Sequence, residues 1–95
     1  MASAELQSTV DLLRRAFPHG LDDAAYRGAI VVLVPHMGSR ALATVMAEVT
    51  GKEWIIPLHD AMRAEQGELA SEDEISNARS KLAAAGLAEW VAEED

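Results

Sequence analysis

Three histidines, His19, His36 and His59, are the only side chains in this sequence suited to proton transfer near neutral pH. His19 and His36 each follow a proline in a predicted turn, where exposed polar residues are ordinary. His59 precedes Asp60 on a predicted helix, but adjacent helical residues point about 100° apart and do not form a dyad directly. The sequence also lacks a Gly-x-Ser-x-Gly elbow that would orient a nucleophile. We therefore predict that the protein is not an enzyme.

Metal binding would require ligands from separate parts of the chain to meet. Glu53, His59 and Asp60 could converge only if the segment 52–57 folds back on the following helix. The sequence has no cysteine, no pair of histidines four residues apart and no glycine-rich phosphate loop. We expect no metal and no cofactor.

The charge of the chain is concentrated in its second half. Residues 1–47 carry four arginines and four acidic residues, whereas residues 48–95 carry four basic and twelve acidic residues. The whole net charge of −8 therefore arises after residue 47. An acidic surface repels phosphate backbones and attracts basic partners, although it also serves simply to keep a protein soluble.

Two tryptophans, Trp54 and Trp90, lie in this acidic half. Tryptophan is enriched among the residues that anchor protein interfaces, so both are possible partner-binding residues. The alternative is that both indoles fill the edges of a small core. The first alternative predicts a protein-interaction module whose partner is a basic protein, contacted through residues 48–95.

A second functional class is a nucleic-acid binder in which the second and third predicted helices form a helix-turn-helix. A recognition helix requires basic and amide side chains on its outer face. The third predicted helix offers only Arg40, together with Thr44, Glu48 and Thr50, and has no Asn or Gln. Nucleic-acid binding is therefore the less favoured function.

The central element that would position these residues is the stretch Asp22–Met37. Its residues 29–34 form the longest apolar run in the chain, which predicts a helix enclosed by the others. Asp22 or Asp23 can cap its start, and Pro35 should end or kink it near Val34. Successive spacings of four, three and four residues predict a single inward face: Tyr26, Ile30, Leu33 and Met37.

Two helices flank this element in the first half of the chain. The first is predicted from about Ala4 to Phe17, with an outer pair between Asp11 and Arg15, and Pro18 stops it. The other is predicted from Arg40 to Thr50, with Ser39 as its cap and Gly51 as its left-handed end.

Two further helices are predicted in the acidic half. One should start at Pro57 and end near Gln66, with Leu58, Ala61 and Met62 facing inward and Trp54 and Ile55 packing from the approach segment. The other should begin at a capping box formed by residues 71–74 and end before Gly86. Residues 88–95 are predicted to be an acidic tail.

These elements predict an all-α fold: a single small bundle of about five helices, occupying residues 1–95 as one domain. The N-terminus lacks the basic and apolar regions of a signal peptide. No apolar run approaches the length of about 20 residues that a membrane helix requires. We expect a cytoplasmic protein with no membrane contact.

The segment Leu12–Leu21, Leu-Leu-Arg-Arg-Ala-Phe-Pro-His-Gly-Leu, resembles an element of the actinobacterial family called domain of unknown function 3349. The cap at residues 71–74 and the sequence Lys-Leu-Ala-Ala-Ala-Gly at residues 81–86 are similar to the last helix of that family. The resemblance spans roughly residues 6 to 87, and Pro35 and Pro57 depart from it. It implies a small bundle of about five helices and no established activity, so it assigns no catalytic residue.

Overall fold

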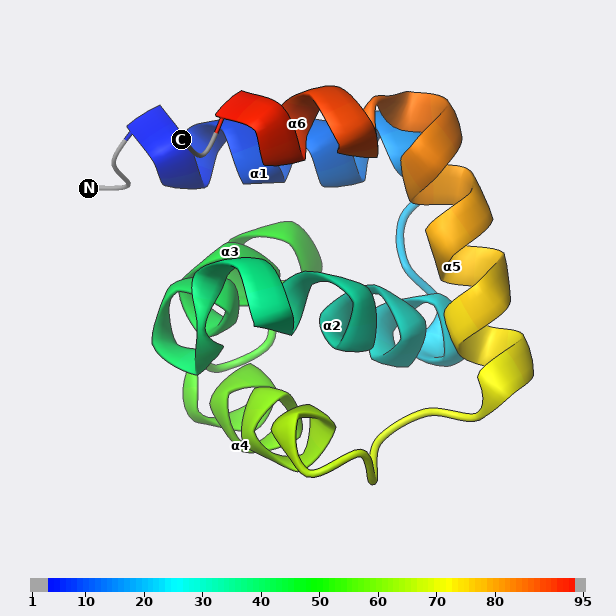
Figure 1. Ribbon diagram of the computed structural model, residues 1–95. Helices are drawn as coiled ribbons and strands as arrows, with labels where there is room; N and C mark the ends of the chain where they lie inside the picture. The colour runs from blue at the N-terminus through cyan, green and yellow to red at the C-terminus, as the bar shows by residue number, and fades with distance from the viewer. Residues whose placement is uncertain (1–3, 94–95) are drawn as a thin grey trace.

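The computed structural model describes residues 4–93, which form six helices and contain no strand. The predicted all-α bundle is confirmed, with one helix more than expected (Figure 1). The helices, in chain order, are α1 (Ala4–Ala16), α2 (Asp23–Met37), α3 (Ser39–Thr50), α4 (Ile55–Glu65), α5 (Glu72–Ala85) and α6 (Leu87–Glu93).

Helix α2 is the enclosed element of the bundle and packs against α3, α4 and α5. Asp22 caps it, as one of the two predicted residues, because its Oδ1 accepts a hydrogen bond from the Ala25 N–H at 2.8 Å. Seven of its residues are buried: Tyr26, Gly28, Ala29, Ile30, Val32, Leu33 and Val34. Burial on nearly every side follows from the apolar run, since no face of the helix centre carries charge.

Of the two outcomes predicted near Val34, an end or a kink, the end is wrong, because the helix continues through Pro35 to Met37. Proline removes one backbone hydrogen bond, but Pro35 is exposed and lies in the last turn. The Gly38 N–H still bonds to the Val34 carbonyl at 3.1 Å, so the final turn closes. Ser39 was predicted to cap α3 but is instead its first residue; Gly38 precedes it without a side-chain cap.

Helix α1 ends at Ala16, one residue before its predicted end, because Pro18 disfavours a helical conformation at the preceding residue. The predicted pair between Asp11 and Arg15 does not form. Asp11 instead accepts a hydrogen bond from Gln7 at 3.1 Å. Arg15 reaches across to α5, where its Nε donates to the Ala85 carbonyl at 3.1 Å.

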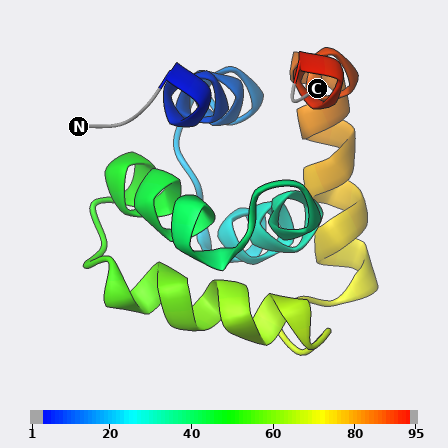
Figure 2. The same cartoon turned by 60° about the vertical axis from the view of Figure 1, so that its left-hand side comes forward.

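Helix α4 begins two residues earlier than predicted, at Ile55, and Pro57 is buried within its first turn. Proline is tolerated there because the first-turn N–H groups have no intrahelical acceptor. Figures 1 and 2 both place α4 at the lower edge of the molecule, with the other helices only on its inner side. α4 contacts α2 and α3.

Helix α5 begins at the predicted capping box, in which Ser71 and Glu74 exchange hydrogen bonds, and ends at Gly86 with φ of 111°. The predicted acidic tail at 88–95 is wrong for its described part, because residues 87–93 form helix α6. Helix α6 packs against α1 and α5 (Figure 1). The remaining tail residues, Glu94 and Asp95, lie outside the described residues.

The approach of α2 to α5 is unusually close at Gly28. A methyl group at this position would overlap the Glu74 carbonyl oxygen and lie 2.8 Å from the Ala78 side chain. Beside this contact, Arg27 forms an ion pair with Glu74 at 2.5 Å. A glycine inside a helix is therefore used here to bring two helices together.

Candidate functional site

Four large apolar side chains are exposed in the described part of the chain, and all of them lie between residues 54 and 62. Trp54 is 42% exposed, Ile55 and Ile56 are each 45% exposed, and Met62 is 48% exposed. Trp54, Ile55 and Met62 were predicted to pack inward, so this prediction is wrong. Apolar residues that gather on one surface, rather than being scattered singly, are a feature of interaction sites.

The rotation of α4 about its own axis explains this exposure. Its buried residues are Pro57, Ala61 and Ala64. These compact side chains let α4 lie close to its neighbours, and at 3.6 residues per turn the longer ones then face outward. Ile55 and Met62, seven residues apart, share the outer face.

We define the α4 apolar face by four residues: Trp54, Ile55, Leu58 and Met62. Leu58 is half-buried and follows Trp54 by four residues, as Met62 follows Leu58, so these three form one ridge along the helix. Ile56 lies to the other side of this face, beyond the exposed His59. The apolar face is therefore a narrow stripe about two turns long.

A hydrogen bond to α2 fixes the inner side of α4. The Tyr26 hydroxyl donates to Asp60 Oδ2 at 2.6 Å. Burial, together with this hydrogen bond to a carboxylate, raises the pKa of Tyr26. Asp60 is held inward and His59 is exposed, so Glu53, His59 and Asp60 do not converge within the described residues, and the one arrangement that could have held a metal is not formed there.

The Trp54 side chain is partly exposed, yet a hydrogen bond restrains its position. Its indole Nε1 donates a hydrogen bond to Thr44 Oγ1 on α3 at 3.2 Å. The ring therefore lies against the α3 surface while 42% of the residue remains open to solvent. This combination restricts the side chain before any partner binds.

Trp90 has the opposite environment. It is 6% exposed, and its Nε1 donates to Thr9 Oγ1 of α1 at 3.2 Å in a buried hydrogen bond. The His36 ring lies edge-on to the indole, with ring centroids 5.9 Å apart. In this structure Trp90 joins α6 to the core, so we do not include it in the candidate surface.

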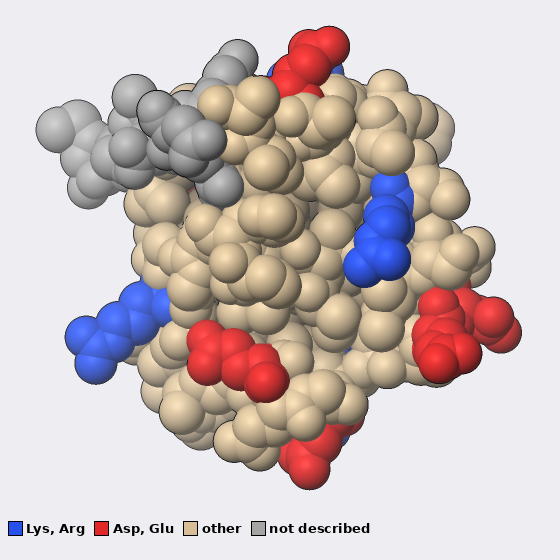
Figure 3. Space-filling view, in the orientation of Figure 1, with Lys and Arg blue, Asp and Glu red and all other residues tan. Residues whose placement is uncertain are grey.

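Near the α4 apolar face, the basic side chains contact other groups of the protein, whereas most of the acidic side chains form no ion pair in the described chain. Lys52 Nζ lies 5.2 Å from the centre of the Tyr26 ring, and Arg63 lies 4.0 Å from Asp60. Four other carboxylates in this part of the chain are exposed and form no ion pair within residues 4–93: Glu48, Glu53, Glu65 and Glu68. Acidic side chains are visible over the lower part of the molecule, where α4 lies, in Figure 3.

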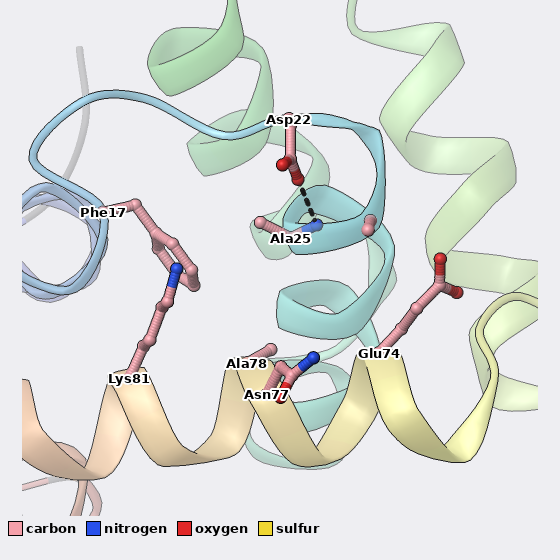
Figure 4. Close-up of a pocket in the computed structure, with 8 residues that line it drawn as sticks. Phe17, Asp22, Ala25, Glu74, Asn77, Ala78 and Lys81 are labelled. Carbon is pink, nitrogen blue, oxygen red and sulfur yellow. Dashed lines mark hydrogen bonds between the residues drawn. The ribbon is translucent and has the colours of Figure 1, made fainter.

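A second candidate is a pocket of about 120 Å³ between the start of α2 and the side of α5 that faces it (Figure 4). Three of the four polar side chains that line it already have partners inside the protein. Asp22 caps α2, and Lys81 lies 5.6 Å from the centre of the Phe17 ring. Glu74 is bound by Arg27, a hydrogen bond that lowers the pKa of this carboxyl to about 2. A ligand would have to compete with all three interactions.

The three histidines do not form a catalytic or metal-binding group in the described residues. His19 and His59 are exposed in separate parts of the fold, and His36 lies against Trp90. Within residues 4–93, no three or more His, Cys, Asp or Glu side chains come together in a way that could hold a metal ion. The absence of enzymatic activity and of a cofactor stays a prediction.

The helix pair α2–α3 differs from a helix-turn-helix in its connection. Only Gly38 separates the two helices, whereas the DNA-binding motif has a turn of about three or four residues. The exposed side of α3 carries Arg40, Thr44 and Glu48, and Thr44 is already bonded to Trp54.

No family model matches the chain, and neither a curated protein nor a solved structure matches it. The resemblance to domain of unknown function 3349 therefore stays a prediction. None of the helices within residues 4–93 has both the length and the apolar character needed to cross a membrane.

Proposed function

We propose that this protein is a non-catalytic interaction module that binds another protein through the α4 apolar face. The observation that carries the proposal is that every exposed large apolar side chain of the described residues lies between Trp54 and Met62. Exposing these groups to water is unfavourable, and a partner that covers them recovers roughly 25 cal/mol for each Å² of apolar surface. Folding does not require these side chains to be exposed to solvent. We therefore assign their exposure to the binding of a partner.

Trp54 and Met62 would contribute most of the free energy of binding. Tryptophan is a frequent interface hot spot, and the bond to Thr44 reduces the entropy that its side chain would lose on binding. Methionine adapts its shape to different apolar partners. Both residues lie on one ridge of α4, so a single partner segment can contact them together.

The partner we propose is a basic protein. Residues 48–95 carry the whole net charge of −8 and include the α4 apolar face. Complementary charge would chiefly increase the rate of association, while the apolar contacts would determine the lifetime of the complex. The acidity also argues against the alternative of nucleic-acid binding by α2 and α3, which we do not propose.

The proposal is tested by site-specific photocrosslinking in the cells that make this protein. A benzoylphenylalanine at position 62 should crosslink to a protein, whereas the same group at the exposed Ala84 of α5 should not. The captured protein, once identified and purified, should bind the unmodified chain directly. Its affinity should fall about tenfold, equivalent to about 1.4 kcal/mol, when Met62 is changed to Gln.

Two outcomes would contradict the proposal. One is the absence of any crosslink from position 62 when the protein is folded and abundant. The other is a partner that crosslinks instead near Arg14, Arg15 and Arg27, in the half of the chain that carries no net charge.

A further inference from the structure

We infer that the segment received by the α4 apolar face is an amphipathic helix with lysine or arginine residues at both ends of its apolar stripe. This inference rests on the proposed function and specifies the partner's local structure and charge. The inference follows from the shape of the face and from which charged side chains around it already have partners within the protein.

The shape of the face suits a helix. Trp54, Leu58 and Met62 are spaced by four residues, and ridges with this spacing fit the grooves between side chains of a second helix. The eight steps from residue 54 to residue 62 advance about 12 Å along the axis, so the partner would contribute two to three turns. An extended peptide would find no sheet edge to pair with, because residues 4–93 contain no strand.

The charge of the partner follows from which side chains near the face already have partners. The two cations of the segment both contact groups of the protein itself: Lys52 Nζ lies over the Tyr26 ring, and Arg63, whose side chain is 58% exposed, lies 4.0 Å from Asp60. The carboxylates of Glu53 and Glu65 are exposed and form no ion pair in the described chain. What the segment offers to a partner is therefore negative charge.

These carboxylates flank the two ends of the apolar face. Glu53 directly precedes Trp54, and Glu48 lies one helical turn from the Thr44 that holds the Trp54 indole. Glu65 and Glu68 follow Met62 and lie near the end of α4, where the negative end of the helix dipole adds to their charge. A partner helix would therefore meet negative charge at both ends of its apolar stripe.

A second copy of this chain fits the face less well than a basic helix. Two copies would each bring a net charge of −8, and the unpaired carboxylates around one face would meet those around the other. Like charges brought together across an interface cost free energy unless they are neutralised. Self-association through this face would be seen in the experiment below as dimers that Met62→Gln dissociates.

The experiment uses the full chain and synthetic helical peptides of about 18 residues, or five turns. The first peptide has leucines on one face and lysines on its flanks, and in the second every lysine is replaced by glutamate. A third has the composition of the first in an order that does not segregate the leucines. Binding is measured by calorimetry and mapped by backbone amide shifts in nuclear magnetic resonance spectra.

We expect only the first peptide to bind appreciably, with amide shifts concentrated in residues 48–68. Met62→Gln should weaken this binding about tenfold, and the matched control Ala84→Gln should leave it unchanged. Glu65→Gln should slow association, whereas Glu72→Gln, on the first turn of α5, should not.

Several results would overturn the inference. Equal binding of the lysine and glutamate peptides would refute the charge assignment, and equal binding of the scrambled peptide would refute the helical one. Shifts centred outside residues 48–68, or dimers of the chain that Met62→Gln dissociates, would show a different site or occupant. If all peptides fail but position 62 still crosslinks to a protein in cells, the inference fails while the proposed function stands.

Discussion

Helices α2 and α4 show two different uses of apolar residues. In α2 the large side chains Ile30, Leu33 and Val34 are buried, together with its small ones. In α4 the buried positions are Pro57, Ala61 and Ala64, and larger side chains face water. Apolar content alone therefore does not decide whether a helix is buried. A helix with neighbours on several sides buries most of its side chains, whereas a helix at the edge of the bundle buries only the side chains that face a neighbour.

The same difference separates a folding role from a binding role. The apolar residues of α2 contribute to the core, and their loss should be felt as loss of stability. The exposed residues of α4 contribute little to the folded state, so their substitution should be felt mainly in binding. An aspartate introduced in place of an apolar residue in each helix tests this distinction.

The largest expected effect is that of an aspartate in α2. Val32 is 6% exposed, and Val32→Asp would place an unpaired charge within the core, so we expect the protein not to fold. Ile55→Asp on the α4 face should change the free energy of unfolding by less than about 1 kcal/mol. Circular dichroism and urea denaturation of both variants measure the difference. Comparable losses would show that the two helices do not differ as described.

The next effect concerns the two tryptophans. Trp90→Ala should cost about 3–5 kcal/mol, because it removes a buried indole and leaves the Thr9 hydroxyl without this donor. Trp54→Ala should cost about 1 kcal/mol, since it removes a partly exposed ring and one exposed hydrogen bond. Chemical denaturation gives both values. A larger loss for Trp54→Ala would mean that its role is structural.

A smaller loss is expected at the contact of α2 with α5. Alanine has a higher helix propensity than glycine by about 1 kcal/mol, so Gly28→Ala would be stabilising if there were space for a methyl group. The Glu74 carbonyl and the Ala78 side chain occupy that space, so we expect a net destabilisation of about 1–3 kcal/mol. A thermal melt above that of the parent would show that α5 can move away without cost.

The smallest effect is a pH dependence at the ion pair beside this contact. Arg27 lowers the pKa of Glu74 in the folded state to about 2, below its usual value of 4.5. The folded state therefore binds the Glu74 proton less readily, and the resulting stabilisation is present above pH 4.5 and declines as the pH falls toward 2. The melting temperatures of the parent and Glu74→Gln should converge over this range. A constant difference would exclude Glu74 ionisation as its source.

The helical fold class and most helix ends follow from local patterns in the sequence. The Asp22 cap, the capping box at Ser71 and the left-handed glycines at Gly51 and Gly86 are all present as predicted. The enclosed position of α2 was also predictable from its apolar run. These features depend on residues within about four positions of one another, so a short stretch of sequence contains all the information.

The orientation of α4, the exposure of Trp54 and the burial of Trp90 depend on tertiary contacts. The sequence pattern of α4 allowed an inner face built on Leu58 and Met62, and it allowed one built on Ala61 and Ala64. Contacts with α2 and α3 selected the second, because compact side chains permit the closest approach. Trp90 is buried through a bond to Thr9, 81 residues away in the sequence, and local signals do not encode such a distant partner.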